Sequence, residues 1–210
     1  MRSLAMQWYR AVKTIRGRKY IYEQKTYRAG KHVRTLNRYV GPATTVFYHA
    51  TREVFDHFDV SKAGAHTGWA NASFGIFFSD NKDAVLEFAE NTRDGDDRPV
   101  NLKTARLNIR NPLDLTTEGL FNKAKQAPLI VKLLGGEDLS PEDALAHLNE
   151  TIDLGTLNEV YEGIYDSLDN KKLMQEHGYD GIVSQFGQDE NGDTIKEYVA
   201  FENSQITTNE

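Results

Sequence analysis

The feature that most constrains the fold is an apolar run around one glycine, from Ser73 to Asp80, which reads Ser-Phe-Gly-Ile-Phe-Phe-Ser-Asp. Three aromatic residues in an extended apolar segment are typical of a buried β-strand. The next residues predict a short helix over Asn81 to Asn91, because Ser79 or Asp80 can cap it and its apolar residues share one face. Such a corner forms one wall of a slot for a flat ligand, although a buried strand packed on a core helix explains the same pattern.

The length and composition indicate a globular protein of one domain, with or without a small appendage. The chain has 210 residues, of which 39% are hydrophobic and 27% charged. It has no cysteine, and its six histidines form no ligand-spaced motif, so we expect no metal. No apolar run of about 18 residues occurs, which predicts no membrane contact. Residues 1–7 are too short and too polar for a secretory signal, so we expect a cytoplasmic protein.

The first part of the chain is strongly basic. Residues 1–40 hold eleven Lys or Arg residues and one acid, Glu23, whereas the rest of the chain is acidic. The turn residues predict three strands, over residues 8–15, 19–28 and 32–40. Aromatic residues are interleaved with cations in these strands, and cations suit phosphates while exposed aromatic faces suit unstacked bases.

We therefore expect residues 1–42 to form a basic β-meander that binds nucleic acid. An alternative is a small solvated sheet that docks on the acidic remainder of the same chain. The expected nucleic-acid-binding cations are Arg10, Lys13, Arg16, Arg18, Lys19, Arg28, Arg34 and Arg38.

Residues 43–210 predict a second domain of the α+β class. Strands are expected over residues 45–51, 100–109 and 197–201 in addition to the apolar run, and helices dominate residues 116–177. Within the helical region, Ser140 followed by Pro141 marks a helix start. One apolar stripe is predicted to face the core; it comprises Leu157, Val160, Tyr161, Ile164 and Leu168.

Three short segments of this second part stand in a suggestive order. They are Tyr48-His49-Ala50-Thr51, Gly75-Ile76-Phe77-Phe78 and Glu197-Tyr198-Val199-Ala200-Phe201. Together they resemble the catalytic core of the ADP-ribosyltransferases, in the branch of the poly(ADP-ribose) polymerases and diphtheria toxin. That family carries a His in His-Gly-Ser/Thr, a Tyr in Gly-Ile-Tyr-Phe and a Glu in Glu-Tyr-Val. Residues 111–113 and 178–183 also resemble phage- and plasmid-borne members.

The resemblance covers about residues 43 to 207 and implies a split β-sandwich with a helical insertion, preceded here by the basic three-stranded appendage. It implies that NAD is the substrate. Glu197 would stabilise the positive charge that develops on the nicotinamide ribose, as in glycoside cleavage, and would hold the ribose 2′-hydroxyl. The resemblance assigns catalysis to His49, Phe77 and Glu197. It assigns NAD binding to His49, Ala50, Thr51, Gly75, Phe77 and Phe88.

Within that NAD site, the resemblance implies that His49 hydrogen-bonds the adenosine ribose and that the backbone of Ala50 holds the nicotinamide carboxamide. Phe77 and Phe88 would stack on the two faces of the nicotinamide ring. Two positions depart from the family pattern: the triad tyrosine is Phe77, which lacks the hydroxyl, and the glycine after the histidine is Ala50. These departures leave open a catalytically inactive nucleic-acid-binding module. An NAD glycohydrolase, which uses water as the acceptor, is another alternative.

The position two residues before Glu197 bears on the acceptor. Arginine-directed members carry Glu or Gln there, and this chain has Ile195. An arginine acceptor is therefore disfavoured, and with the basic segment this favours mono-ADP-ribosylation of nucleic acid, RNA in particular, over protein. By analogy with toxin–antitoxin and phage-defence members, we expect a toxin or antiviral role with an antitoxin protein as a partner.

Overall fold

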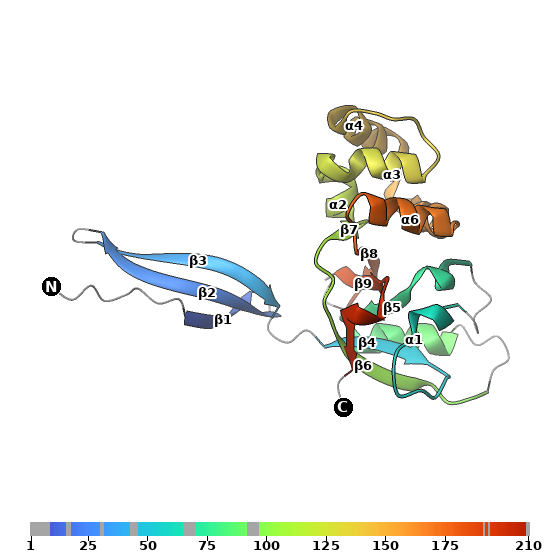
Figure 1. Ribbon diagram of the computed structural model, residues 1–210, viewed down its shortest axis with the longest axis horizontal. Coiled ribbons are helices and arrows are strands. Elements are labelled where there is room, and N and C mark those ends of the chain that lie inside the picture. The colour runs from blue at the N-terminus through green and yellow to red at the C-terminus, as the bar shows by residue number, and fades with distance from the viewer. Residues whose placement is uncertain are drawn as a thin grey trace. The chain divides into compact units, whose positions relative to one another are not determined.

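The computed structural model (Figure 1) describes residues 9–15, 18–29, 32–42, 46–64, 70–91, 97–190, 192 and 194–208. The chain divides into two compact units, Met1–Thr45 and Val46–Glu210. The expected boundary after residue 42 lies close to this division.

The first unit is an antiparallel three-stranded sheet with the order β1-β2-β3. Its strands are β1 (Tyr9–Ile15), β2 (Arg18–Ala29) and β3 (His32–Pro42), close to the predicted ranges. The ladder between β2 and β3 shifts register at Ile21/Tyr22. Neither of the buried hydrophobic clusters found in the described residues includes a residue of this unit.

The second unit contains a seven-stranded sheet with the order β10-β6-β4-β5-β9-β8-β7. All neighbouring strands are antiparallel except β7 and β8, which are parallel. The strands are β4 (Phe47–Thr51), β5 (Ile76–Ser79), β6 (Asn101–Leu107), β7 (Pro112–Asp114), β8 (Gly181–Gln188), β9 (Thr194–Ala200) and β10 (Ile206–Thr208).

Two short strands differ from the sequence expectation. The segment around Pro112 lies outside the predicted strands, yet it forms β7 beside β8. No strand is predicted after residues 197–201, yet β10 follows and pairs with β6. Both are three-residue strands whose partners lie far away in the sequence, so no local alternation reveals them.

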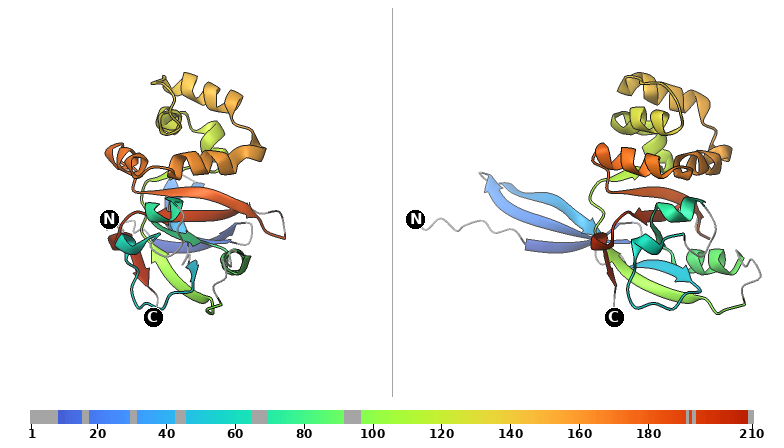
Figure 2. Two further views of the ribbon diagram at one scale, coloured as in Figure 1. Left: turned by 90° about the vertical axis from the view of Figure 1, so that its right-hand side faces the viewer. Right: turned by 45° about the vertical axis from the view of Figure 1, so that its right-hand side comes forward.

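Helices connect and cover the strands. Helix α1 (Lys82–Asn91) follows β5, and five more lie between β7 and β8: α2 (Thr117–Asn122), α3 (Ala127–Leu133), α4 (Pro141–Thr151), α5 (Leu157–Tyr165) and α6 (Leu168–Glu176). Short 3-10 turns occur at Val60–Lys62, Ala70–Phe74, Ala124–Gln126, Leu154–Thr156 and Asn203–Gln205. Figure 2 shows α2–α6 stacked together beside strands β8 and β9.

The two faces of the sheet contribute to different cores. The larger cluster joins the helices to the face that carries Ile182, Val199 and Leu113. The smaller cluster includes Phe47, Phe58, Ile76, Phe78, Ala105 and Ala200, so it lies on the opposite face of β5 and β9. Strands β4 and β5 join the two ends of the sheet through one register pair, Tyr48 opposite Ser79, whereas β4 and β6 pair at five positions. The sheet is therefore weakly joined next to the three motif segments.

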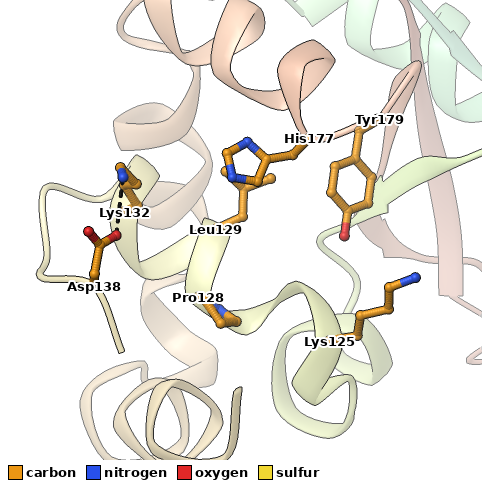
Figure 3. A pocket seen from close by; sticks show the side chains of 7 residues that line it. All are labelled: Lys125, Pro128, Leu129, Lys132, Asp138, His177 and Tyr179. Carbon is orange, nitrogen blue, oxygen red and sulfur yellow. Dashed lines mark hydrogen bonds and ion pairs between the residues drawn. The ribbon is translucent and has the colours of Figure 1, made fainter. Parts of the chain in front are cut away.

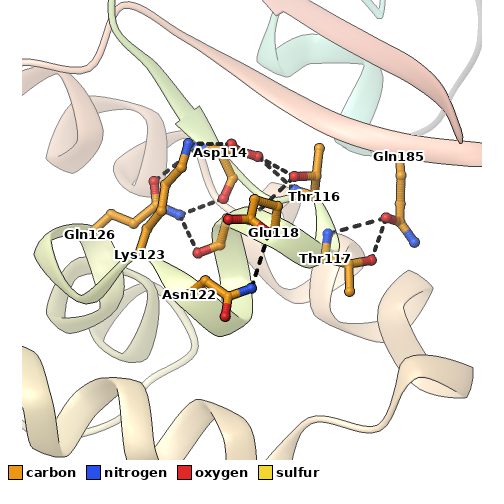
Figure 4. A network of polar contacts seen from close by, with 9 residues as sticks. Asp114, Thr116, Thr117, Glu118, Asn122, Lys123, Gln126 and Gln185 are labelled. Atoms are coloured by element: carbon orange, nitrogen blue, oxygen red, sulfur yellow. Dashed lines mark hydrogen bonds and ion pairs between the residues drawn. The ribbon is translucent and has the colours of Figure 1, made fainter. Parts of the chain in front are cut away.

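A polar network fixes the start of the helical region to the sheet (Figure 4). The Asp114 carboxylate accepts hydrogen bonds from Lys123 and Thr116, while Gln126 donates to the backbone carbonyl of Asp114. On the neighbouring strand, the Gln185 side-chain oxygen accepts from the backbone and the hydroxyl of Thr117. Because these groups are partly or fully buried, except for the exposed Lys123, their pairing holds α2 against β7 and β8.

Candidate active site

The three motif segments lie on adjacent strands. His49 is on β4, Phe77 on β5 and Glu197 on β9, and β5 lies between the other two. In the β5–β9 ladder Phe77 stands opposite Val199, and Ser79 stands opposite Glu197. Directly paired residues share a face of a sheet, so Phe77 and Glu197 are diagonal neighbours on the face that carries the helical core. The fold thus brings the segments of His49 and Phe77, which are 28 residues apart in the sequence, beside that of Glu197, which lies more than a hundred residues further along the chain.

Glu197 lies in a partly buried position beside a hydroxyl group. Ser184 stands opposite it on β8, and the Ser184 Oγ donates a hydrogen bond of 3.2 Å to the Glu197 Oε1. Burial raises the pKa of Glu197 to about 7, and the Ser184 hydrogen bond opposes this rise. The described lysines Lys171 and Lys196 form no ion pair with it; Lys171 instead donates to the Phe201 carbonyl. Because no cation among the described residues contributes to the pKa shift of Glu197, its carboxylate can interact with a positive charge on a bound substrate.

Phe77 packs against a tyrosine of the helical region. Its ring lies 5.6 Å from the ring of Tyr165 at an interplanar angle of 64°. The Tyr165 hydroxyl is buried and has no hydrogen-bond partner among the described residues. Burial, followed by the nearby Glu197 carboxylate, raises the pKa of Tyr165 well above its ordinary value. The hydroxyl that is missing from Phe77 thus has a counterpart close to Glu197 on α5.

His49 points to the other face of the sheet. Its ring lies 5.5 Å from Phe58 and 5.7 Å from Phe78, within the smaller hydrophobic cluster. The Nδ1 atom lies 2.8 Å from the backbone carbonyl oxygen of Phe77, so Nδ1 carries the hydrogen because a carbonyl only accepts. Burial lowers the pKa of His49, which keeps the ring neutral. Its Nε2 is then a hydrogen-bond acceptor, and the ring links β4 to β5 where the ladder is weakest.

The other residues expected to bind NAD have diverse settings. Ala50 and Thr51 complete β4, and the Thr51 hydroxyl accepts from the Glu53 amide. Phe88 on α1 is 43% exposed. Gly75 has a packing role of its own, since a Cβ at this position would collide with the carbonyl oxygen of Ala200 on β9. The glycine therefore permits close contact between β5 and β9.

Hollows lie at two places in the described part of the second unit. One of about 720 Å³ is lined by Phe55, Phe58, Lys103 and neighbouring residues of β6 and β10, and so adjoins the rings around His49. The other, of about 240 Å³ (Figure 3), is lined by Lys125, Lys132, His177, Tyr179 and others in the helical region. Neither is lined by Phe77 or Glu197, so the candidate site rests on strand geometry.

The expected nucleic-acid-binding cations are divided between two faces of the small sheet. Arg34 and Arg38 are exposed on β3, opposite Tyr27 and Glu23, and Arg38 lies 3.8 Å from Glu23. Lys13 faces the other way, bonded to Asn37 at 2.7 Å and 4.7 Å from the centre of the Tyr22 ring. Arg28 is exposed on β2. The backbones of Arg10, Arg18 and Lys19 lie in β1 and β2, and Arg16 lies outside the described residues.

Sequence reasoning missed three residues that the fold places at or near these motifs. Ser184 on β8 donates a hydrogen bond to Glu197, and Tyr165 on α5 packs against Phe77. Only the tertiary structure brings these two residues to the motifs. Arg52 follows the His49 motif directly, and an arginine immediately after Tyr48-His49-Ala50-Thr51 was the available signal. The helix cap was also mispredicted: Asn81, and not Ser79 or Asp80, accepts the amide hydrogens of Asp83 and Ala84.

Comparison with known proteins identifies a family. The family described as ADP-ribosyltransferase in polyvalent proteins matches residues 43–209. No curated protein and no solved structure matches. Among the described residues, no helix is both long and apolar enough to cross a membrane. The family match covers most of the chain, including all three motif segments and the whole described seven-stranded sheet, so this protein belongs to the ADP-ribosyltransferase superfamily.

Proposed function

We propose that this protein is an NAD-dependent mono-ADP-ribosyltransferase that uses Glu197 as its catalytic carboxylate. The observation that carries the proposal is the setting of Glu197: partly buried, bonded to Ser184, and diagonal to Phe77 on the neighbouring strand. A desolvated carboxylate interacts strongly with a nearby positive charge, which is what the transition state of NAD cleavage develops.

In the proposed reaction the bond between the nicotinamide nitrogen and the ribose carbon breaks, and nicotinamide leaves with the bonding electron pair. The ribose carries the positive charge in an oxocarbenium-like transition state, which Glu197 stabilises. A nucleophile of the acceptor then bonds to the ribose carbon and loses its proton. Because Glu197 has a pKa of about 7, its charged form is only partly populated at neutral pH.

The remaining site residues have supporting roles in this proposal. The neutral His49 ring lies on the other face of the sheet from Phe77 and Glu197, and its Nε2 would accept from the adenosine ribose, since Nδ1 is engaged by the Phe77 carbonyl. The Ala50 backbone would hold the nicotinamide carboxamide, while Phe77 and the exposed ring of Phe88 would contact the nicotinamide. Gly75 directly precedes β5 and Thr51 ends β4, so both lie at the ends of the strands that carry Phe77 and His49.

We further propose that the acceptor is a nucleic acid, RNA before DNA or protein. The exposed cations Arg34 and Arg38 support this, because exposed guanidinium groups attract phosphates. A toxin or antiviral role in the cytoplasm, controlled by an antitoxin protein, is the setting that such an activity would suit.

The test is incubation of the purified protein with labelled NAD and, in separate tubes, total RNA, DNA or lysate protein. We expect label on RNA, and none with the Glu197→Gln variant, whose fold should be intact. Glu150→Gln, on the exposed face of α4, is the matched control and should keep full activity. Free ADP-ribose with no labelled polymer would show that the protein hydrolyses NAD and does not transfer ADP-ribose to these polymers. No NAD turnover with the wild-type protein would reject the catalytic proposal.

A further inference from the structure

An arginine at the end of β4 has an unfilled hydrogen-bonding edge. Arg52 follows Thr51 directly, and its Nη1 donates a 2.8 Å hydrogen bond to the Ala89 carbonyl near the end of α1. This bond places a cation at a helix C-terminus, where the helix dipole favours it. It explains one of the three guanidinium nitrogens.

The other two nitrogens of Arg52 are unexplained. Nε and Nη2 are buried, and neither has a hydrogen-bond partner among the residues that the structure describes. Buried donors without partners destabilise a protein, and charged ones do so most, so each such group calls for an explanation. The nearest carboxylate in the sequence, Glu53, is engaged by Arg98 at 2.8 Å. No described carboxylate thus neutralises Arg52 by direct contact.

The unpaired edge has a defined chemistry. Nε–H and Nη2–H point in the same direction, and together they match two oxygens of one carboxylate or phosphate. A lysine could also bond to the Ala89 carbonyl, but it could not offer this second, two-pronged edge. The geometry is that of an arginine that needs an oxyanion to complete its hydrogen bonds.

The location of Arg52 identifies the class of oxyanion. It is the next residue after Ala50 and Thr51, and its partner Ala89 is the next residue after Phe88, so it joins the two elements to which NAD contacts are assigned. We propose that Arg52 binds the diphosphate of NAD through Nε and Nη2, after the atoms covering this edge move aside. This inference rests on the proposed function for its ligand, but its test does not require turnover.

The test measures binding of ADP, inorganic pyrophosphate and adenosine to the full chain by calorimetry. Arg52→Gln removes the charge and the two-pronged edge, and it should weaken ADP and pyrophosphate binding by about tenfold or more while adenosine binding is unchanged. Arg52→Lys keeps the charge and a donor for the Ala89 carbonyl, so it protects the fold and should recover only a minor part of the lost affinity. Arg106→Gln, which removes an exposed charge from β6, is the control and should bind like the wild type.

The outcomes separate this inference from the proposed function. Equal ADP binding by the wild type and either Arg52 variant would overturn it, as would equal losses for ADP and adenosine or no ADP binding by the wild type. If Arg52→Gln fails to fold, Arg52→Lys decides by the same comparison. Arg52-dependent ADP binding without NAD turnover would preserve the inference and reject the catalytic proposal. NAD turnover with Arg52-independent ADP binding would do the reverse.

Discussion

The two units of this chain are stabilised differently. In the second unit two hydrophobic clusters bury large side chains such as Phe74, Phe78 and Leu120 completely. Among its described residues the first unit contributes to neither cluster, and apolar side chains such as Val33 and Leu36 are exposed. Its described side-chain bonds are between polar groups, for instance Lys13 with Asn37. The second unit therefore depends on buried apolar side chains and the first on backbone pairing between strands. The same kind of substitution should change the stability of the two units by different amounts.

The largest expected effect is on the free energy of unfolding when a leucine is truncated. Leu120 is fully buried in the larger cluster, so Leu120→Ala should destabilise the second unit by about 2–5 kcal/mol. Leu36 is 49% exposed, and Leu36→Ala should change stability by less than about 0.5 kcal/mol. Denaturant unfolding of both variants measures the difference. Similar losses for the two would show that the first unit has a core of its own.

The next effect is a pH dependence of the second unit. The pKa of Glu197 is about 7 in the folded protein and 4.5 ordinarily, so between these values the folded state binds more protons than the unfolded state. Stability from this group is therefore complete below pH 4.5 and is lost as pH rises through 7, by about 3 kcal/mol. Activity should change in the opposite direction, because it requires the charged carboxylate.

Unfolding of the wild type and Glu197→Gln across pH 4 to 9 tests this prediction. The neutral glutamine cannot ionise, so the stability difference between the two proteins should grow in favour of the variant as pH rises from 4.5 to about 7 and stay constant at higher pH. A constant difference across this range would mean that Glu197 titrates near its ordinary pKa.

A smaller effect is expected from the cations of the first unit. Arg34→Gln combined with Arg38→Gln should weaken RNA binding by about tenfold and lower the slope of log K against log salt by about 1 to 1.5. Lys125→Gln combined with Lys172→Gln removes the same charge from exposed positions of the second unit and should have little effect. Fluorescence anisotropy at several salt concentrations measures both pairs. A larger loss in the control pair would place RNA on the second unit.

The sequence predicted the parts of this structure whose signals are local. The strands of the first unit, the strand of Phe77 and the cap of α4 all follow from neighbouring residues, and the Ser140 hydroxyl accepts from the Asp143 amide as expected. The predicted apolar stripe is confirmed at four positions of α5, which are Leu157, Val160, Tyr161 and Ile164. The prediction was wrong at Leu168, which begins α6. Leu168 is exposed because Ser167 caps a new helix, and Tyr165 takes the buried position instead.

The parts that depend on distant contacts could not be predicted. The order of the motifs indicated that His49, Phe77 and Glu197 belong to neighbouring strands. It did not indicate that the His49 ring lies on the other face of the sheet, because a face depends on register with strands far away in the sequence. The hydroxyls of Ser184 and Tyr165 near Glu197 come from segments with no motif, so only the packing of the helices against the sheet reveals them.

The smallest predicted effect tests the polar side of the same comparison. The Tyr165 hydroxyl is buried without a partner, so Tyr165→Phe should stabilise the second unit by about 1 kcal/mol, since it removes an unsatisfied group and keeps the ring against Phe77 and Phe74. Tyr27→Phe in the first unit is the matched change at a partly exposed tyrosine and should be neutral. Thermal unfolding measures both. A loss of stability in Tyr165→Phe would mean that the hydroxyl is bonded in solution, and Ser184 and Glu197 are then the groups that would hold it.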